Sequence, residues 1–223
     1  MDNFVITIAR GFGSGGKQIG LALSKQLQIL SMASNYSGIN KDLFFQVDEK
    51  LRGYHLIKRL MKSANKDDIV EPTDKSFISD VNLYNIQAKI IKELAKQQSC
   101  IIIGKCANHL LRDYENTVSV YIEAPRAFCV KNVIERLGVT EEEAHRMIYQ
   151  TDRYRADYYK YYTGGETWTN PVLYDMTLNS DRMGMDKCTE LIIQYLKIKL
   201  GEDILDKKGT AENDKALKQL GLF

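Results

Sequence analysis

A glycine-rich segment near the beginning of the chain has the residue types and spacing of a phosphate-binding loop. Gly11-Phe12-Gly13-Ser14-Gly15-Gly16-Lys17 fits the pattern G-x-x-x-x-G-K. Glycines let successive backbone N–H groups turn towards one phosphate, and the lysine adds a mobile ammonium group for the β- and γ-phosphates of a nucleotide. A glycine-rich connection without a ligand is the alternative. The residues expected to bind the nucleotide are Gly11, Gly13, Ser14, Gly15, Gly16, Lys17 and Gln18.

The sequence lacks the two usual magnesium ligands of such a site, one next to the loop and one at the end of a later apolar run. Gln18 follows Lys17, where a Ser or Thr hydroxyl normally contacts Mg²⁺. The apolar run that ends in Ile103-Gly104-Lys105 carries no acidic residue there, so the usual metal-holding Asp is missing. We expect ATP and Mg²⁺ as cofactors, with the ion bridging the ATP phosphates through water. The sequence identifies no protein ligand for the metal.

A second group of charged residues, Asp152, Arg153, Arg155 and Asp157, lies on one predicted helix. Arginines in such a position can neutralise charge on a transferring phosphoryl group. Arg153 and Arg155 are two residues apart and do not share a helix face, so both reach one phosphate only if the helix is irregular there. A solvated salt-bridge face is the alternative. The tyrosines that follow are interpreted as packing for this helix, with stacking on a base as the second possibility.

The elements around these residues alternate between strand and helix. Residues 4–9 are a β-branched apolar run, typical of a strand buried on both faces, and apolar residues recur at helical spacing over 17–30. Thr140 and Glu143 form a capping box at the start of a long helix. This alternation predicts a parallel sheet with helices on both faces. Further strands are predicted at 100–103, 117–122 and 174–178, and further helices at 79–98, 125–137, 140–162 and 185–200.

Two stretches have weaker patterns. Short helices are predicted at 42–51 and 55–64, with an exposed loop at 66–75. Residues 201–223 are charged and weakly amphipathic, so we expect a peripheral helix or a tail there. No internal repeat and no long linker divides the chain, which predicts a single domain over residues 1–200.

The composition excludes several classes of protein. Hydrophobic residues make up 44% and charged residues 27% of the 223 positions, as in ordinary globular domains. A formal net charge of +2 argues against a nucleic-acid binder held by bulk charge. No apolar run approaches the roughly 18 residues of a membrane span, so no membrane partner is expected. The four cysteines form no Cys-x-x-Cys pair and no histidine has zinc-ligand spacing to them, so we expect reduced thiols in a cytoplasmic protein.

Beyond the loop, the sequence contains further blocks with a recognisable arrangement. One runs from Ile6 to Arg10 and leads into the loop, and a second runs from Cys100 to Ala107. The others are Tyr121 to Pro125, Thr151 to Tyr159, Tyr161 to Gly164, Trp168, and Tyr174 to Ser180. Together these blocks resemble the cytidylate kinase-like family of bacterial P-loop kinases, and the resemblance covers most of residues 3–198.

This resemblance implies the fold class: an α/β, nucleoside-monophosphate-kinase-like, three-layer architecture with a parallel sheet of about four to five strands flanked by helices. It also implies a helical monophosphate-binding region at about 31–98 and a helical lid at about 140–165. In true cytidylate kinases the acceptor is CMP or dCMP, and lid arginines close over the transferring phosphate. The second strand of this family is expected to be shortened or missing here, because residues 27–32 run on from the first helix without it.

The resemblance also suggests which residues meet the acceptor. Family members commonly have Gly-Arg where this chain has Gly104-Lys105. Lys105 is therefore a candidate ligand of the acceptor phosphate, without the bidentate fork of an arginine. The other candidate acceptor contacts are Arg10, Arg153 and Asp157, and for Arg10 a structural salt bridge is the alternative.

These observations favour an ATP-dependent phosphotransferase whose acceptor is a nucleoside monophosphate similar to CMP. Lys17, Arg153 and Arg155 are the expected catalytic residues. Two other hypotheses stay open. The missing metal ligands are compatible with a nucleotide-binding regulatory protein that has no catalytic activity, and the poor resemblance of the monophosphate region leaves room for a P-loop kinase of a non-nucleotide small molecule.

Overall fold

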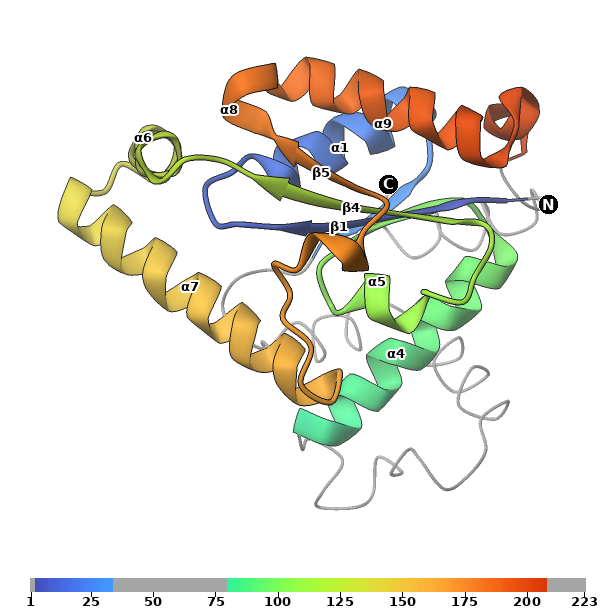
Figure 1. Cartoon of the computed structure of the whole chain (residues 1–223), viewed down its shortest axis with the longest axis horizontal. Coiled ribbons are helices and arrows are strands. Elements are labelled where there is room, and N and C mark those ends of the chain that lie inside the picture. Colours follow the sequence, from blue (N-terminus) through green and yellow to red (C-terminus); the bar gives the residue numbers. More distant parts are fainter. Residues whose placement is uncertain (1–2, 34–79, 208–223) are drawn as a thin grey trace, which may run out of the picture.

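The computed structural model describes residues 3–33 and 80–207 of the chain (Figure 1). The helices predicted at 42–51 and 55–64 and the loop at 66–75 lie outside the described residues, as do positions 208–223. In the described part, five strands pair in parallel in the order β2-β3-β1-β4-β5. The strands are β1 (Val5–Arg10), β2 (Leu30–Ala33), β3 (Cys100–Ile103), β4 (Thr117–Glu123) and β5 (Met176–Asn179).

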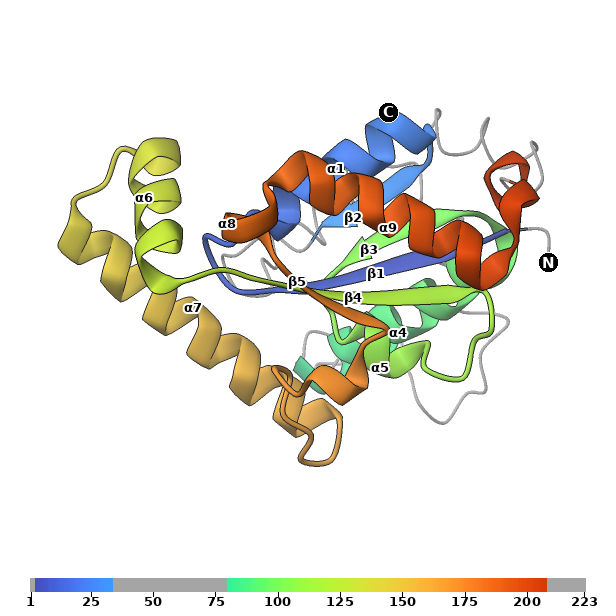
Figure 2. The same ribbon diagram turned by 45° about the horizontal axis from the view of Figure 1, so that its top comes forward.

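Helices cover both faces of this sheet, which confirms the predicted three-layer α/β architecture (Figure 2). None of the helices in residues 3–33 and 80–207 is long and apolar enough to cross a membrane. The helices are α1 (Gly16–Leu27), α4 (Asp80–Gln97), α5 (Ala107–Leu110), α6 (Arg126–Leu137), α7 (Glu141–Tyr162), α8 (Ser180–Met183) and α9 (Met185–Leu200), with 3₁₀ helices at Pro171–Leu173 and Glu202–Asp206.

The two cores follow from the alternation of side chains along the strands. Ile6 and Ile8 of β1 point to the face that α1 and α9 cover. Val5 and Ile102 point to the opposite face, against α4 and α5. Successive residues of a strand face opposite sides of a sheet, and helices on both sides bury both sets. Ile204 of the last 3₁₀ helix also lies in the first core, so the chain just after α9 is packed against the domain.

The first helix is shorter than its apolar spacing predicts, and this difference makes room for β2. The helix was expected to reach residue 30, but α1 ends at Leu27 because Gln28 adopts a left-handed conformation, with φ of 55°. The Ser24 hydroxyl donates to the Ile29 carbonyl at 2.6 Å and supports this turn. The chain then enters β2, which pairs with β3. The second strand is therefore short, as expected, and the alternative that it is missing was wrong.

Most other predicted elements differ from the structure only at their ends. The capping box is present: the Glu143 N–H donates to Thr140 Oγ1 at 3.3 Å, and the Thr140 N–H donates to Glu143 Oε2 at 2.9 Å. The last strand begins at Met176 rather than at residue 174, because its pairing with β4 begins at Met176, opposite Val120.

Helices α6 and α7 form a hairpin that extends beyond the carboxyl ends of the strands (Figures 1 and 2). The hairpin has a small apolar core of its own, which includes Val133 of α6 and Ile148 of α7. Phe12 of the glycine-rich loop also belongs to this core. The predicted lid at about 140–165 therefore packs directly on the loop.

Candidate active site

The glycine-rich loop lies at the carboxyl edge of the sheet, between β1 and α1. The chain reaches β3 and β4 on opposite sides of β1, so the strand order reverses at this point. Open α/β sheets bind their ligands at such a switch point. Ile8 pairs with Ile103 and Arg10 pairs with Ile122, so the segments that follow β3 and β4 lie beside the loop.

The loop has the backbone conformation that its glycines allow. Gly13 and Gly15 have φ values of 87° and 85°, which residues with a side chain rarely adopt. A Cβ atom on Gly13 would lie 2.6 Å from the Cys129 carbonyl oxygen, so the loop packs closely on α6. Asn132 of α6 donates to the Gly13 carbonyl at 2.9 Å. The loop is therefore held by the hairpin of α6 and α7 as well as by the sheet.

The Ser14 hydroxyl is used inside the loop rather than in the space above it. It donates to the Gly11 carbonyl at 2.9 Å, and the Ile122 carbonyl oxygen lies 3.1 Å away. The Ser180 hydroxyl at the start of α8 donates to the Ser14 carbonyl at 2.5 Å. Ser14 was predicted to bind the nucleotide. In the structure its hydroxyl stabilises the loop, so only its backbone could contact a phosphate.

A cavity of about 390 Å³ opens over the loop and the first turn of α1. Four of its lining residues are cations and none carries a carboxylate. Lys17 is exposed, and its ammonium group makes no ion pair within residues 3–33 and 80–207. The cavity is therefore electropositive. Its lining consists of Arg10, Gly11, Phe12, Gly13, Gly15, Gly16, Lys17, Gln18, Leu21, Arg136, Leu137 and Arg155.

Arg10 is a buried cation without a counterion in the described part of the chain. Only 7% of the surface of Arg10 is accessible to solvent. Its guanidinium has no hydrogen bond or ion pair to residues 3–33 or 80–207. Burial lowers the pKa of Arg10 to about 9, with Arg155 acting in the same direction and Asp152 opposing it. The expected alternative, a structural salt bridge, is not formed with any described residue. A buried charge of this kind favours an anionic ligand.

Lys105 lies beside Arg10 in an unusual turn after β3. Gly104, Lys105 and Cys106 have successive positive φ values of 80°, 63° and 53°. A side chain at Gly104 would be strained at this φ value, and its Cβ atom would require the Arg10 guanidinium to move. Burial lowers the pKa of Lys105 and the nearby charge of Arg10 lowers it further, while Cys106 acts in the opposite direction. The turn thus places two cations near each other despite their repulsion.

Arg155 reaches the loop from α7 and joins this group. Its Nη1 atom donates to the Arg10 carbonyl at 3.0 Å and to Asp152 Oδ1 at 3.1 Å. Asp152 also accepts from the Phe12 N–H at 2.9 Å. Burial raises the pKa of Asp152, although Arg155 and the Phe12 N–H favour its charged form. The sequence placed Asp152 on the same helix but gave no sign that it holds the loop.

Arg153 and Asp157 do not reach the cavity. The helix α7 is continuous from Glu141 to Tyr162, so the irregularity that would bring Arg153 beside Arg155 is absent. The side chains of Arg153 and Asp157 are 68% and 75% exposed and form an ion pair at 3.9 Å on the solvent side. Of the two predicted catalytic arginines, the structure brings only Arg155 to the phosphate-binding loop.

Gln18 and Arg136 close the side of the cavity next to α6. With its amide oriented to suit both neighbours, Gln18 donates to the Gly15 carbonyl at 3.3 Å and accepts from Arg136 Nη1 at 3.2 Å. Arg136 was not predicted as a site residue, because its position in the last turn of an amphipathic helix carries no signal in the sequence. In place of a metal-binding hydroxyl, the residue after Lys17 therefore connects the loop to α6.

The residues around the cavity do not supply a ligand set for Mg²⁺. The lining has no carboxylate, and residues 3–33 and 80–207 contain no group of three or more potential metal ligands. Asp152 is engaged with Phe12 and Arg155, and Glu123 lies beyond Gly11, with Oε1 3.9 Å from where a Cβ of Gly11 would be. A magnesium ion here would depend on phosphate oxygens and water for its coordination.

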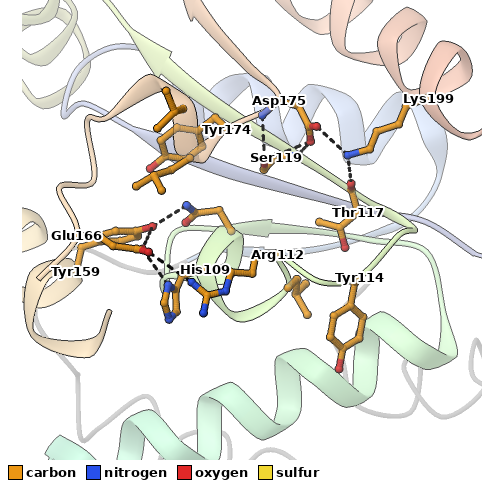
Figure 3. A pocket seen from close by; sticks show the side chains of 14 residues that line it. His109, Arg112, Tyr114, Thr117, Ser119, Tyr159, Glu166, Tyr174, Asp175 and Lys199 are labelled. Carbon is orange, nitrogen blue, oxygen red and sulfur yellow. Dashed lines mark hydrogen bonds and ion pairs between the residues drawn. The ribbon is translucent and has the colours of Figure 1, made fainter. Parts of the chain in front are cut away.

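A second cavity, of about 330 Å³, lies between α5 and the segment that precedes β5 (Figure 3). Its charged side chains are all paired. Lys199 donates to Asp175 at 2.8 Å, and Asp175 also accepts from the Ser119 N–H at 2.7 Å. On the opposite wall, Glu166 pairs with His109 at 3.0 Å and with Arg112 at 3.4 Å. This cavity therefore has no surplus of either charge.

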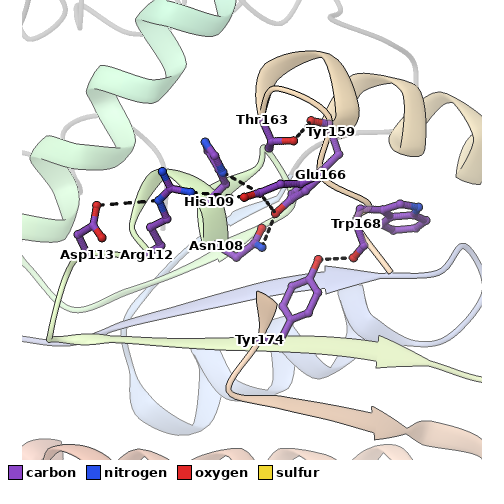
Figure 4. A network of polar contacts seen from close by, with 9 residues as sticks. All are labelled: Asn108, His109, Arg112, Asp113, Tyr159, Thr163, Glu166, Trp168 and Tyr174. Atoms are coloured by element: carbon purple, nitrogen blue, oxygen red, sulfur yellow. Dashed lines mark hydrogen bonds and ion pairs between the residues drawn. The ribbon is translucent and has the colours of Figure 1, made fainter. Parts of the chain in front are cut away.

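The Glu166 cluster also connects the end of α7 to α5 (Figure 4). Asn108 donates to the Tyr159 hydroxyl at 2.9 Å, and that hydroxyl lies 3.5 Å from Glu166 Oε2. Because α5 follows the Lys105 turn directly, these contacts support the helix next to that turn.

The chain is similar to known proteins in sequence and in structure. The sequence profile of the cytidylate kinase-like family matches residues 5–182. An uncharacterised protein from Eubacterium ventriosum has 25% sequence identity and a TM-score of 0.62, covering 87% of this chain and 99% of its own. Shikimate kinase from Bacteroides thetaiotaomicron has 12% identity and a TM-score of 0.47, covering 87% and 98%. Gluconokinase from Sinorhizobium meliloti has 11% identity and a TM-score of 0.48, covering 90% and 95%. No curated protein matches the chain.

Proposed function

The chain belongs to the cytidylate kinase-like family, and on that premise we propose that it transfers the γ-phosphoryl group of ATP to a nucleoside monophosphate similar to CMP. The observation that carries this proposal is the surplus of positive charge at the carboxyl edge of the sheet. Arg10, Lys105 and Arg155 lie together there, with Asp152 as the carboxylate that pairs with Arg155. A phosphate monoester dianion has the charge that offsets this surplus.

The donor half of the site consists of the loop and Lys17. Backbone N–H groups of the loop and the first turn of α1 favour an anion, because the N-terminus of a helix carries a partial positive charge. Lys17 lines the cavity with an ammonium group that can follow the β- and γ-phosphates. Arg136 and Gln18 lie on the rim of the same cavity and add contacts for the nucleotide.

The acceptor half is assigned to the Arg10 and Lys105 side of the loop. Binding the acceptor phosphate there would satisfy the buried guanidinium of Arg10 and relieve its repulsion with Lys105. Arg10 lines the donor cavity too, so an acceptor phosphate held by it lies next to the γ-phosphate. The geometry assigns no acceptor role to Arg153 and Asp157, which pair in solvent.

The chemistry that these residues support is positioning and charge stabilisation rather than proton transfer. An oxygen of the acceptor phosphate forms a bond to the γ-phosphorus while the bond between that phosphorus and the ADP oxygen breaks. Negative charge spreads over the transferring group, and Arg155 is positioned to stabilise it, held by Asp152 and the Arg10 carbonyl. We propose that ATP enters as its magnesium complex, with the metal held by phosphates and water.

A regulatory, catalytically silent nucleotide-binding protein is the second candidate, favoured by Gln18, whose amide is engaged with Gly15 and Arg136 where a metal-binding hydroxyl would be. A kinase of a non-nucleotide small molecule is compatible with the donor half alone. Neither accounts for the buried Arg10, which has no ion-pair partner among residues 3–33 and 80–207, as directly as an acceptor phosphate does. All four cysteines are free and buried, which fits the proposed cytoplasmic location.

The test is a coupled assay of ADP formation from Mg-ATP across CMP, dCMP, UMP, AMP and GMP, with Lys17→Ala as the control. We expect turnover with one pyrimidine monophosphate and its loss in the variant. Detectable ATP binding without ADP formation for any acceptor would move the assignment to the regulatory candidate. Turnover that Lys17→Ala leaves intact would exclude the cavity at the glycine-rich loop as the donor site.

A further inference from the structure

Phe12 occupies an unusual place for a residue of a phosphate-binding loop, because its side chain lies in the core of the lid. It is 8% exposed and packs with a group of apolar residues from α6 and α7. These residues include Cys129, Val133, Ala144 and Ile148. Its backbone N–H donates to Asp152 of α7 at 2.9 Å. The loop and the lid hairpin are thus joined at one residue through both its side chain and its backbone.

Two cations of the donor cavity approach the ring of Phe12. The Cζ atom of Arg136 lies 5.8 Å from the ring centroid, and the Cζ atom of Arg155 lies 5.6 Å from it. Both distances are within the range at which the face of an aromatic ring attracts a guanidinium. Arg136 and Arg155 come from different helices of the hairpin, and both line the cavity with Phe12.

We propose that Phe12 is a positioning residue that holds Arg136 and Arg155 at the rim of the donor cavity and so determines how tightly the nucleotide phosphates bind. The inference rests on the proposed function of the same site. The two guanidinium groups repel each other, and no carboxylate lines the cavity between them. Nη1 of Arg155 already bonds Asp152 and the Arg10 carbonyl, and the ring offers each guanidinium a further contact that uses none of its N–H donors. The aromatic character of residue 12, and not only its size, is what this role requires.

The alternative is that Phe12 serves only to fill the core of the lid. Leucine at this position fills most of the same space but has no ring face, so Phe12→Leu separates the two roles. Phe128 provides the matched control, because it packs against the same core. Within residues 3–33 and 80–207, its ring makes no cation–π contact with Arg136 or Arg155. The two variants lose the same atoms from one cluster.

The experiment is calorimetric titration of ATP into the full-length wild-type protein, Phe12→Leu and Phe128→Leu, with thermal unfolding to confirm that each variant is folded. We expect Phe12→Leu to bind ATP about tenfold more weakly, as for the loss of two cation–π contacts, and Phe128→Leu to stay within about twofold of the wild type. Equal losses in the two variants would overturn the inference, since they would indicate packing alone.

A double-mutant cycle then tests whether Phe12 acts through Arg136. In an Arg136→Gln background, Phe12→Leu should weaken ATP binding by only about threefold, because one of its two partners is already gone. A full tenfold loss in that background would contradict the positioning role. If the wild type does not bind ATP at all, the proposed function falls and this inference with it. Wild-type binding that Phe12→Leu leaves unchanged overturns the inference alone.

Discussion

The cavity at the glycine-rich loop and the cavity beside α5 are similar in size but differ in how their charges are arranged. In the cavity at the phosphate-binding loop, Arg10 is buried and unpartnered within the described residues, and no carboxylate lines the wall. In the cavity beside α5, each charged side chain has a partner, as in the pairs of Lys199 with Asp175 and of Arg112 with Glu166. Volume does not distinguish these two cavities, and we propose that the balance of charge is what marks the loop cavity as a ligand site.

The difference has a physical reason. A buried charge that lacks a partner lowers the stability of the free protein, and a ligand of opposite charge removes that cost on binding. A charge that is already paired offers a ligand little gain, because the existing partner has to be displaced. We therefore expect substitutions in the loop cavity to change function, and substitutions in the second cavity to change stability.

The largest effect is expected for Lys17→Ala. Removing one preorganised cation from the phosphate site should lower turnover by about 10²–10³ fold. Lys25 lies on the same helix and is exposed, so Lys25→Ala serves as the control and should keep wild-type turnover. Steady-state rates of ADP formation measure both, and equal rates for the two variants would mean that the loop is not the donor site.

Arg10→Met should affect function and stability in opposite directions. Loss of a charge-assisted contact should raise the KM for the acceptor by about 10–100 fold. The same change removes a buried charge without a partner, so the free energy of unfolding of the free protein should rise by about 1–3 kcal/mol. Acceptor kinetics and denaturant unfolding measure the two quantities. A less stable Arg10→Met variant would show that Arg10 has a structural partner.

Glu166→Gln in the second cavity should give the reverse result. It removes the carboxylate that pairs with His109 and Arg112, while Arg112 keeps Asp113, and should lower the free energy of unfolding by about 1–2 kcal/mol, a modest value because the Glu166 pairs are partly exposed. Turnover should stay within about threefold of the wild type, since α5 only supports the Lys105 turn. A loss of ATP binding in this variant would contradict the expectation that the second cavity affects stability and not function.

The smallest effect concerns the protonation of Lys105. Its pKa is lowered in the free protein by burial and by Arg10, and a bound phosphate should raise it. At alkaline pH, acceptor binding should therefore take up a fraction of a proton, and the affinity should fall as the pH rises through the lowered pKa. Calorimetry in buffers of different ionisation enthalpy measures this uptake. If acceptor binding to the Lys105→Met variant still takes up protons, the uptake belongs to a group other than Lys105.

Much of this contrast could be predicted from the sequence, but not all of it. The loop and the buried strands were recognisable because glycine spacing and β-branched runs are local patterns. The end of α1 was missed because the left-handed turn at Gln28 depends on its neighbours. The sequence could not predict the contacts of Phe12, Arg136 and Asp152 for a related reason. These contacts form where the hairpin of α6 and α7 meets the loop, and no local spacing of residues encodes them. Arg153, two positions from Arg155, was overestimated because helix geometry puts the two on different faces.

The most direct test of the account is a crystal structure of the protein with a non-hydrolysable ATP analogue and CMP. We predict the triphosphate on the glycine-rich loop with Lys17, and the CMP phosphate within hydrogen-bonding distance of Arg10 and Lys105. The second cavity should hold neither nucleotide. A CMP phosphate that binds away from Arg10, or a nucleotide in the cavity beside α5, would contradict the claim that unpartnered charge marks the active site.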